Sequence, residues 1–213
     1  MDINVIMQQI SVMILPILLA VTLHEAGHAY TAYKLGDDTA ARQGRLSFNP
    51  LVHVDPFGTV FLPGMMLLLG TGFVFGYAKP VPVNFGRLKK PRRDTILVAL
   101  AGPSANIILA IAGAIVLRVA LGMGYGQMDW IVQTAQFMVF FNCLLFIFNM
   151  MPIPPLDGGR ILMELVSYNT RQKIQQLERF GIFIVLAIVI FIPAVIQVPL
   201  RFLAGLVFTL VGL

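Results

Sequence analysis

Residues 14–28 read ILPILLAVTLHEAGH, and this stretch decides the fold because it sets a charged motif inside an apolar run. Positions i and i+4 of a helix lie on one face, so His24 and His28 can turn both imidazoles toward a single metal ion. Ionisable residues inside a membrane are costly and are functional by default. The stretch therefore predicts a membrane helix, over about residues 9–33, that carries part of a metal site.

The motif His24-Glu25-Ala26-Gly27-His28 has the H-E-x-x-H spacing of zinc-dependent peptidases, in which the glutamate handles the proton of the attacking water. A catalytic zinc ion normally has three protein ligands, and the motif supplies two. The chain has only ten acidic residues and three histidines. The candidates for the third ligand are therefore few: Asp157, His53, Asp55 and Glu164.

Asp157 is the favoured third ligand because its surroundings can hold a carboxylate in an unusual place. Three prolines, at positions 152, 154 and 155, end the preceding apolar helix. Gly158 and Gly159 then allow close backbone approach. The alternative is that Asp157 caps a helix that begins near Gly158. As a loop histidine, His53 is more typical of a hydrogen-bonded residue than of a ligand, and Asp55 before a proline favours a turn.

Composition predicts an all-α polytopic membrane protein. Hydrophobic residues make up 58% of the 213 positions and charged residues 12%, against roughly 25% charged in a soluble domain. We expect a bundle of about five to six membrane helices in a single domain over residues 1–213, with a catalytic core over about 9–160 and C-terminal helices over about 161–213. The net charge of +5 gathers in loops, which favours lipid headgroups over nucleic acid. The single Cys143 permits no intrachain disulfide.

Further apolar runs predict spans over about residues 95–121, 129–151 and 179–196, each long enough to cross the hydrocarbon. The amphipathic piece 161–178 precedes the last of these, and the short run 199–213 predicts an interfacial or tilted helix. Turn residues and short alternation over 42–50 favour a small β-hairpin or an irregular loop. Glycine and proline interrupt the apolar run over 57–75.

A parity argument predicts the topology. His24, His28 and Asp157 must meet at one depth, so the two spans that carry them run in the same direction with an odd number of crossings between them. The span over 95–121 is one crossing, and 57–75 is therefore expected to be re-entrant. Basic residues number three in 34–56, six in 79–94 and four in 157–180. The positive-inside rule puts these segments in the cytoplasm, with the metal site toward that side.

Two motifs together resemble the site-2 protease family, the intramembrane zinc metalloproteases of peptidase family M50. The first is His24-Glu25-Ala26-Gly27-His28. The second is Asn149-Met150-Met151-Pro152-Ile153-Pro154-Pro155-Leu156-Asp157-Gly158, which matches N-x-x-P-x-x-x-L-D-G at every fixed position. The resemblance covers about residues 19–160 and is closest to short members without PDZ or CBS domains. Phe85 departs from it, since the family pattern leads us to expect proline there.

The resemblance implies one Zn²⁺ per chain, held by His24, His28 and Asp157, with Glu25 as general base. Asn149 is implied to hold the substrate carbonyl or the oxyanion. The implied activity is an endopeptidase that cuts transmembrane helices of other membrane proteins, in the lipid bilayer of a prokaryotic inner membrane.

The role of Asn106 and two rival functions stay open. Asn106 lies mid-span and either donates hydrogen bonds near the site or knits two helices together. The rival functions are a catalytically silent relative that binds zinc or a membrane helix, and a metal transporter.

Overall fold

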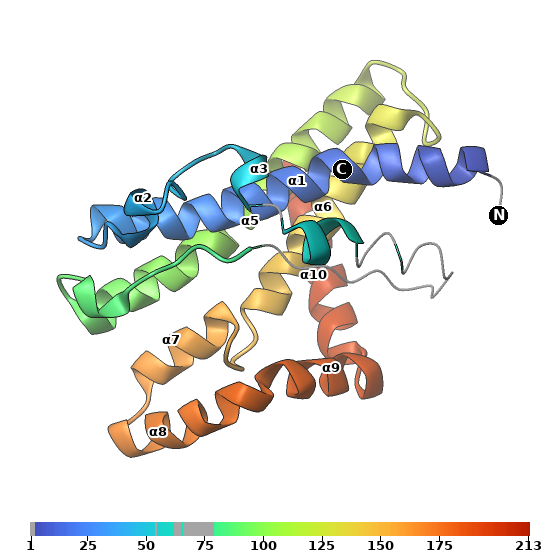
Figure 1. Cartoon of the computed structure of the whole chain (residues 1–213). Helices are drawn as coiled ribbons and strands as arrows, with labels where there is room; N and C mark the ends of the chain where they lie inside the picture. Colours follow the sequence, from blue (N-terminus) through green and yellow to red (C-terminus); the bar gives the residue numbers. More distant parts are fainter. Residues whose placement is uncertain (1–2, 54, 62–64, 66–78) are drawn as a thin grey trace.

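The computed structural model describes residues 3–53, 55–61, 65 and 79–213, and every regular element in these ranges is a helix (Figure 1). Their bounds are α1 (Ile3–Lys34), α2 (Thr39–Arg42), α3 (Pro50–His53), η1 (Pro56–Phe61), η2 (Phe85–Arg87), α5 (Pro91–Gly122), α6 (Trp130–Asn149), α7 (Asp157–Leu165), α8 (Tyr168–Leu177), η3 (Glu178–Phe180), α9 (Gly181–Phe191) and α10 (Ala194–Val211).

Five of the described helical segments are long and apolar enough to cross a membrane. They are Met7–Lys34, Pro91–Gly122, Trp130–Asn149, Tyr168–Phe191 and Ala194–Val211. In hydrocarbon a helix pairs every backbone group within itself, which is why such apolar runs fold this way. The first three segments agree with the predicted spans to within a few residues.

The C-terminal part differs from the prediction in where its helices end. The predicted span over 179–196 stops at Phe191, and the last helix begins at Ala194 and not near Pro199. Pro199 lies inside α10, because a proline removes one intrahelical hydrogen bond without having to end the helix. The resulting 18-residue helix is long enough to be a candidate span, so the prediction of a segment too short to cross was wrong about its length.

Residues 43–49 form an irregular loop between α2 and α3, and the β-hairpin alternative for 42–50 was wrong because no strand occurs in the ranges that the structure describes. Nearby side chains take up the backbone donors that a hairpin would pair. Ser47 Oγ accepts from the Asn49 N–H at 3.0 Å, and Asn49 Oδ1 accepts from the Leu51 N–H at 3.1 Å. Such local side-chain bonds compete with strand pairing. Of the run predicted to be re-entrant, residues 57–61 belong to η1, whereas 62–64 and 66–75 lie outside the described residues.

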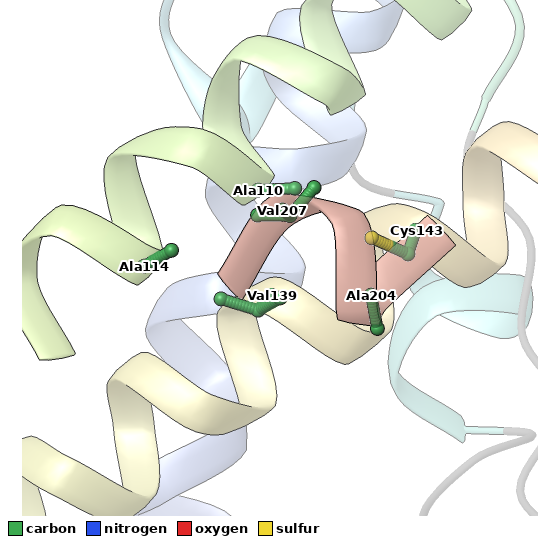
Figure 2. Close-up of a cluster of buried hydrophobic side chains, with 6 residues drawn as sticks. All are labelled: Ala110, Ala114, Val139, Cys143, Ala204 and Val207. Carbon is green, nitrogen blue, oxygen red and sulfur yellow. The ribbon is translucent and has the colours of Figure 1, made fainter. Parts of the chain in front are cut away.

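The core forms where α1, α5 and α6 pack on one another and α10 closes over α5 and α6. Figure 2 shows where α10 packs on α5 and α6. Ala110 and Ala114 of α5 meet residues of α6 and α10 in a cluster that is almost fully buried. The other members are Val139, Cys143, Ala204 and Val207. Cys143 is thus a packing residue.

Small residues bring α1 unusually close to α5. A Cβ added to Gly27 would lie 2.9 Å from the Ala101 carbonyl oxygen, so the two backbones pass in direct contact at this point. Ala20, Ala26 and Ala29 on the same helix are fully buried. Small side chains are what allow such approach between membrane helices. The close crossing lies at the H-E-x-x-H motif and places its histidines against α5.

Candidate metal centre

Two imidazoles from consecutive turns of α1 face each other at the centre of the bundle. The Nε2 atoms of His24 and His28 are 3.0 Å apart. His24 is buried and His28 is partly buried. The i, i+4 spacing on a helix produces this arrangement, as the sequence predicted.

Asp157 joins them from the first residue of α7, far away in the chain. Its Oδ2 atom lies 3.4 Å from each histidine Nε2. The turn between α6 and α7 folds tightly enough to deliver it because two glycines follow. A Cβ on Gly158 would lie 2.6 Å from the Met151 carbonyl oxygen, and one on Gly159 would lie 2.7 Å from the Pro154 Cα. The close backbone approach predicted for this turn is confirmed.

The capping alternative for Asp157 was wrong. The N-cap position of α7 is Leu156, which makes no side-chain cap. Asp157 Oδ2 is buried and has no hydrogen-bond partner. The ionised form of an aspartate side chain is the one that binds metals.

The other nitrogen of each imidazole is already engaged, and this fixes the tautomers. His28 Nδ1 lies 2.7 Å from the Val98 carbonyl oxygen, and His24 Nδ1 lies 2.7 Å from Asn106 Oδ1. Both partners are acceptors, so both Nδ1 atoms carry the proton. In the neutral rings, Nε2 is then left with a free lone pair on each histidine.

A buried amide relay fixes the orientation of Asn106 itself. Asn142 Nδ2 donates to the Met138 carbonyl oxygen at 2.9 Å, which turns Asn142 Oδ1 toward Asn106. Asn106 Nδ2 donates to that oxygen at 2.9 Å and to the Ala20 carbonyl oxygen at 3.4 Å. Its own Oδ1 is thereby left facing His24. Both readings of Asn106 hold, because it bonds a site histidine and also joins α1, α5 and α6.

When the imidazoles are neutral and protonated at Nδ1, the three atoms at the centre are all acceptors, an arrangement that suits a bound cation. In a tetrahedral zinc site with bonds of about 2.0–2.1 Å, neighbouring ligand atoms are about 3.3 Å apart. The observed separations of 3.0, 3.4 and 3.4 Å fit that edge length. Within the described residues, His24, His28 and Asp157 are the one group of three placed to hold a metal ion. The donor set of two imidazoles and one carboxylate suits a catalytic zinc ion with an open position.

Gly102 of α5 forms the wall of this pocket. A Cβ at this position would lie 2.7 Å from both Cε1 and Nε2 of His24, and closer still to Nε2 of His28. Only hydrogen in place of a side chain leaves room for both rings. The sequence analysis missed this residue, although a glycine directly before Pro103 in an apolar span was a visible signal.

The two predicted catalytic residues, Glu25 and Asn149, each make a hydrogen bond to a backbone group. Glu25 is partly buried, and its Oε2 accepts a hydrogen bond from the Val81 backbone N–H at 2.7 Å. Asn149 lies at the end of α6, where its Nδ2 donates to the Leu145 carbonyl oxygen at 3.0 Å. Its role toward a substrate stays a prediction.

The remaining ligand candidates have other partners. His53 is fully buried, and its Nε2 lies 2.8 Å from the Ser47 carbonyl oxygen. Asp55 Oδ1 accepts from the N–H groups of Phe57 and Gly58 in a turn. Glu164 pairs with Arg171 at 2.9 Å. None of these three belongs to the metal-competent group among the described residues.

Comparison with known proteins agrees with this chemistry. The sequence model of Peptidase family M50 matches residues 12–128 and 126–192. The chain is 41% identical over 180 residues to the predicted zinc metalloprotease YwhC of Bacillus subtilis, a match that covers 83% of this chain and 78% of YwhC. It is 30% identical over 180 residues to the predicted zinc metalloprotease Rip2 of Mycolicibacterium smegmatis, covering 81% of this chain and 64% of Rip2. The chain thus spans just under two thirds of that Rip2 sequence. No solved structure gives a significant match.

Proposed function

Because the chain belongs to peptidase family M50, we propose that it is a zinc-dependent endopeptidase that hydrolyses peptide bonds in or near transmembrane helices of other membrane proteins. One observation carries the proposal: His24 Nε2, His28 Nε2 and Asp157 Oδ2 converge within 3.4 Å of one another, with Glu25 beside the first histidine. The residues that fit one zinc ion are these three.

Zinc, when bound, polarises a carbonyl group and lowers the pKa of water toward about 7. The chain supplies the remaining steps. Glu25 accepts a proton from the attacking water and returns it to the leaving amine nitrogen, which balances the hydrolysis. The relay through Asn106 keeps His24 in the tautomer that leaves Nε2 free to bind. We propose that Asn149 steadies the substrate carbonyl oxygen once its amide turns away from the Leu145 carbonyl oxygen.

The position of the site supports the substrate class that we propose. His24 and His28 belong to a candidate span, and that helix packs against two others of the same kind. A peptide bond that reaches them must come from a segment that itself enters the bilayer. Since helical hydrogen bonds shield peptide carbonyls, the substrate helix has to unwind locally before the bond is cut. The distribution of basic loops supports a site toward the cytoplasmic side of a prokaryotic inner membrane.

The two rival functions make different predictions. A transporter needs ligands along a path, whereas the described residues concentrate them in one group. A catalytically silent relative has no need of Glu25 next to the histidines.

We also propose that residues 1–213 act as a single domain.

The test measures two properties of the purified protein in detergent: its zinc content and its rate of peptide-bond hydrolysis, called turnover below. We expect about one zinc per chain in the wild type, much less in Asp157→Ala, and normal zinc with no turnover in Glu25→Gln. Elemental analysis also distinguishes zinc from iron(II), which accepts the same donor set. Zinc retained in Asp157→Ala would contradict the three-residue site. Undiminished turnover in Glu25→Gln would contradict the assignment of the base.

A further inference from the structure

The backbone N–H of Val81 points at the side chain of Glu25. Val81 lies in the irregular segment 79–84, which follows the undescribed residues and runs back past α1 before η2. Its N–H donates to Glu25 Oε2 at 2.7 Å across 56 positions of sequence. A hydrogen bond from a fixed donor to a carboxylate is among the stronger kinds.

The segment is held from both sides, so this donor has a fixed place. The N–H of Lys79 donates to the His53 carbonyl oxygen at 3.0 Å, and Arg45 Nη2 donates to the Lys79 carbonyl oxygen at 2.7 Å. At the other end, the N–H of Asn84 donates to Asp37 Oδ2 at 2.7 Å. Arg45 and Asp37 are themselves buried.

The side chain of Val81 anchors the segment one helical turn from Glu25. It is buried and packs with Ala29 of α1 and Ala40 of α2. Ala29 follows Glu25 by four residues and therefore lies on the same face of α1. Alanine at this position lets the segment lie close to the helix, so that the Val81 N–H reaches the carboxylate.

The flanking residues leave this N–H no competitor. Pro80 and Pro82 have no N–H, and a residue before proline is restricted to extended conformations. The segment therefore has one backbone N–H group between Lys79 and Val83, that of Val81, and this group donates to Glu25. Because the Val81 N–H already donates to Glu25, it is not available to a substrate strand.

We propose that the Val81 N–H is a positioning group for the general base. It fixes Oε2 of Glu25 and leaves Oε1 to take the proton from water. Without the bond, the glutamate side chain regains its freedom of rotation, and the reactive oxygen loses its fixed place. The inference rests on the proposed function, because it needs Glu25 to act as the base.

The first test removes this one donor by Val81→Pro, which suits the extended backbone before Pro82. The matched control is Val83→Pro, because the Val83 N–H makes no hydrogen bond within the part of the chain that the structure describes. The probe is a synthetic peptide of one apolar transmembrane helix, labelled with a fluorophore and a quencher at its two ends, in detergent micelles. We expect kcat to fall about 10-fold to 100-fold in Val81→Pro, while KM, zinc content and the thermal midpoint stay near those of Val83→Pro.

A second substitution covers the case in which Val81→Pro fails to fold. Replacing the amide between Pro80 and Val81 with an ester removes the N–H and keeps the valine side chain. The same fall in kcat is expected. Unchanged or raised kcat in the ester protein, with Glu25→Gln inactive, would overturn this inference alone, and a rise would show that the bond restrains the base. Full activity in Glu25→Gln would overturn the proposed function together with the inference.

Discussion

Gly102→Ala is expected to remove zinc binding while leaving the fold intact. The added Cβ would lie 2.7 Å from Cε1 and Nε2 of His24, where ordinary contact begins at 3.4 Å. The His24 ring would therefore have to retreat by 3.4 minus 2.7, or 0.7 Å, and the His28 ring by more. Metal–ligand distances tolerate shifts of only about 0.2 Å.

The rings cannot retreat freely, because their far sides are bonded to Asn106 and Val98. Losing one outer hydrogen bond to a ligand typically weakens metal binding about 10-fold to 100-fold. Here both ligands shift together, so zinc affinity is expected to fall at least about 100-fold, which is about 2.7 kcal/mol. Alanine itself favours a helix by about 1 kcal/mol over glycine, so helix content is not expected to fall.

The assay is a zinc competition titration against a fluorescent chelator, with circular dichroism of the same samples. Gly122→Ala is the matched control, because it lies on the same helix and an added Cβ there meets nothing within 4 Å. Zinc affinity in Gly102→Ala equal to that in Gly122→Ala would refute the reasoning, since the pocket would then have room that the structure denies it.

Three further predictions follow from the relay, the loops and the topology. Asn142→Leu leaves the Asn106 amide without its main partner and is expected to weaken zinc binding about 10-fold to 100-fold in the same titration. Thr134→Val is its control on α6, since that hydroxyl has no hydrogen-bond partner among the described residues; equal affinities would count against the relay. Burial raises the pKa of Asp37, but hydrogen bonds from Thr39 and Asn84 outweigh it and lower that pKa below its usual range. A lowered pKa stabilises the fold above the unfolded-state pKa, and the effect is lost as pH falls through the folded-state value. The difference in unfolding free energy between wild type and Asp37→Asn should therefore be largest near neutral pH and shrink below about pH 4; a gap that does not change with pH would contradict this. In a Cys143→Ala background, single cysteines at Gln43 and Lys90 are expected to react with an impermeant thiol reagent from the cytoplasmic side, and one at Gln127 from the opposite side. Labelling of Gln43 and Lys90 from opposite sides would refute the parity argument.

The features that could be predicted from the sequence are those that depend on neighbouring residues in the chain. The H-E-x-x-H spacing places two imidazoles on one helix face whatever surrounds the helix. The prolines and glycines around Asp157 mark a break in which a carboxylate can turn inward. Long apolar runs have few alternatives to a helix in hydrocarbon. These rules located three of the five candidate spans to within a few residues.

What the sequence could not predict depends on contacts between distant segments. Asn142 reaches His24 only through Asn106, and Val81 reaches Glu25 only because Arg45 and Asp37 hold its segment. Neither relation leaves a periodic signal. The loop over 43–49 has the turn residues of a hairpin, but its Asn49 N–H bonds to the side chain of Ser47, and its Arg45 side chain reaches the Lys79 carbonyl oxygen.

The metal site depends on close backbone approach at two places, and the two control different ligands. At the crossing of α1 and α5, Gly27 and Gly102 set the position of both histidines on a continuous helix. At the turn after α6, Gly158 and Gly159 set the position of Asp157 alone, because a Cβ on Gly158 would meet the backbone at Met150 and Met151. An added Cβ meets backbone at both places, at Ala101 for Gly27 and at Met150 and Met151 for Gly158, so neither place admits a methyl group without a shift of the backbone. The histidine pair and the third ligand are therefore positioned by separate backbone contacts. A change at Gly158 is expected to displace Asp157 without displacing the histidines.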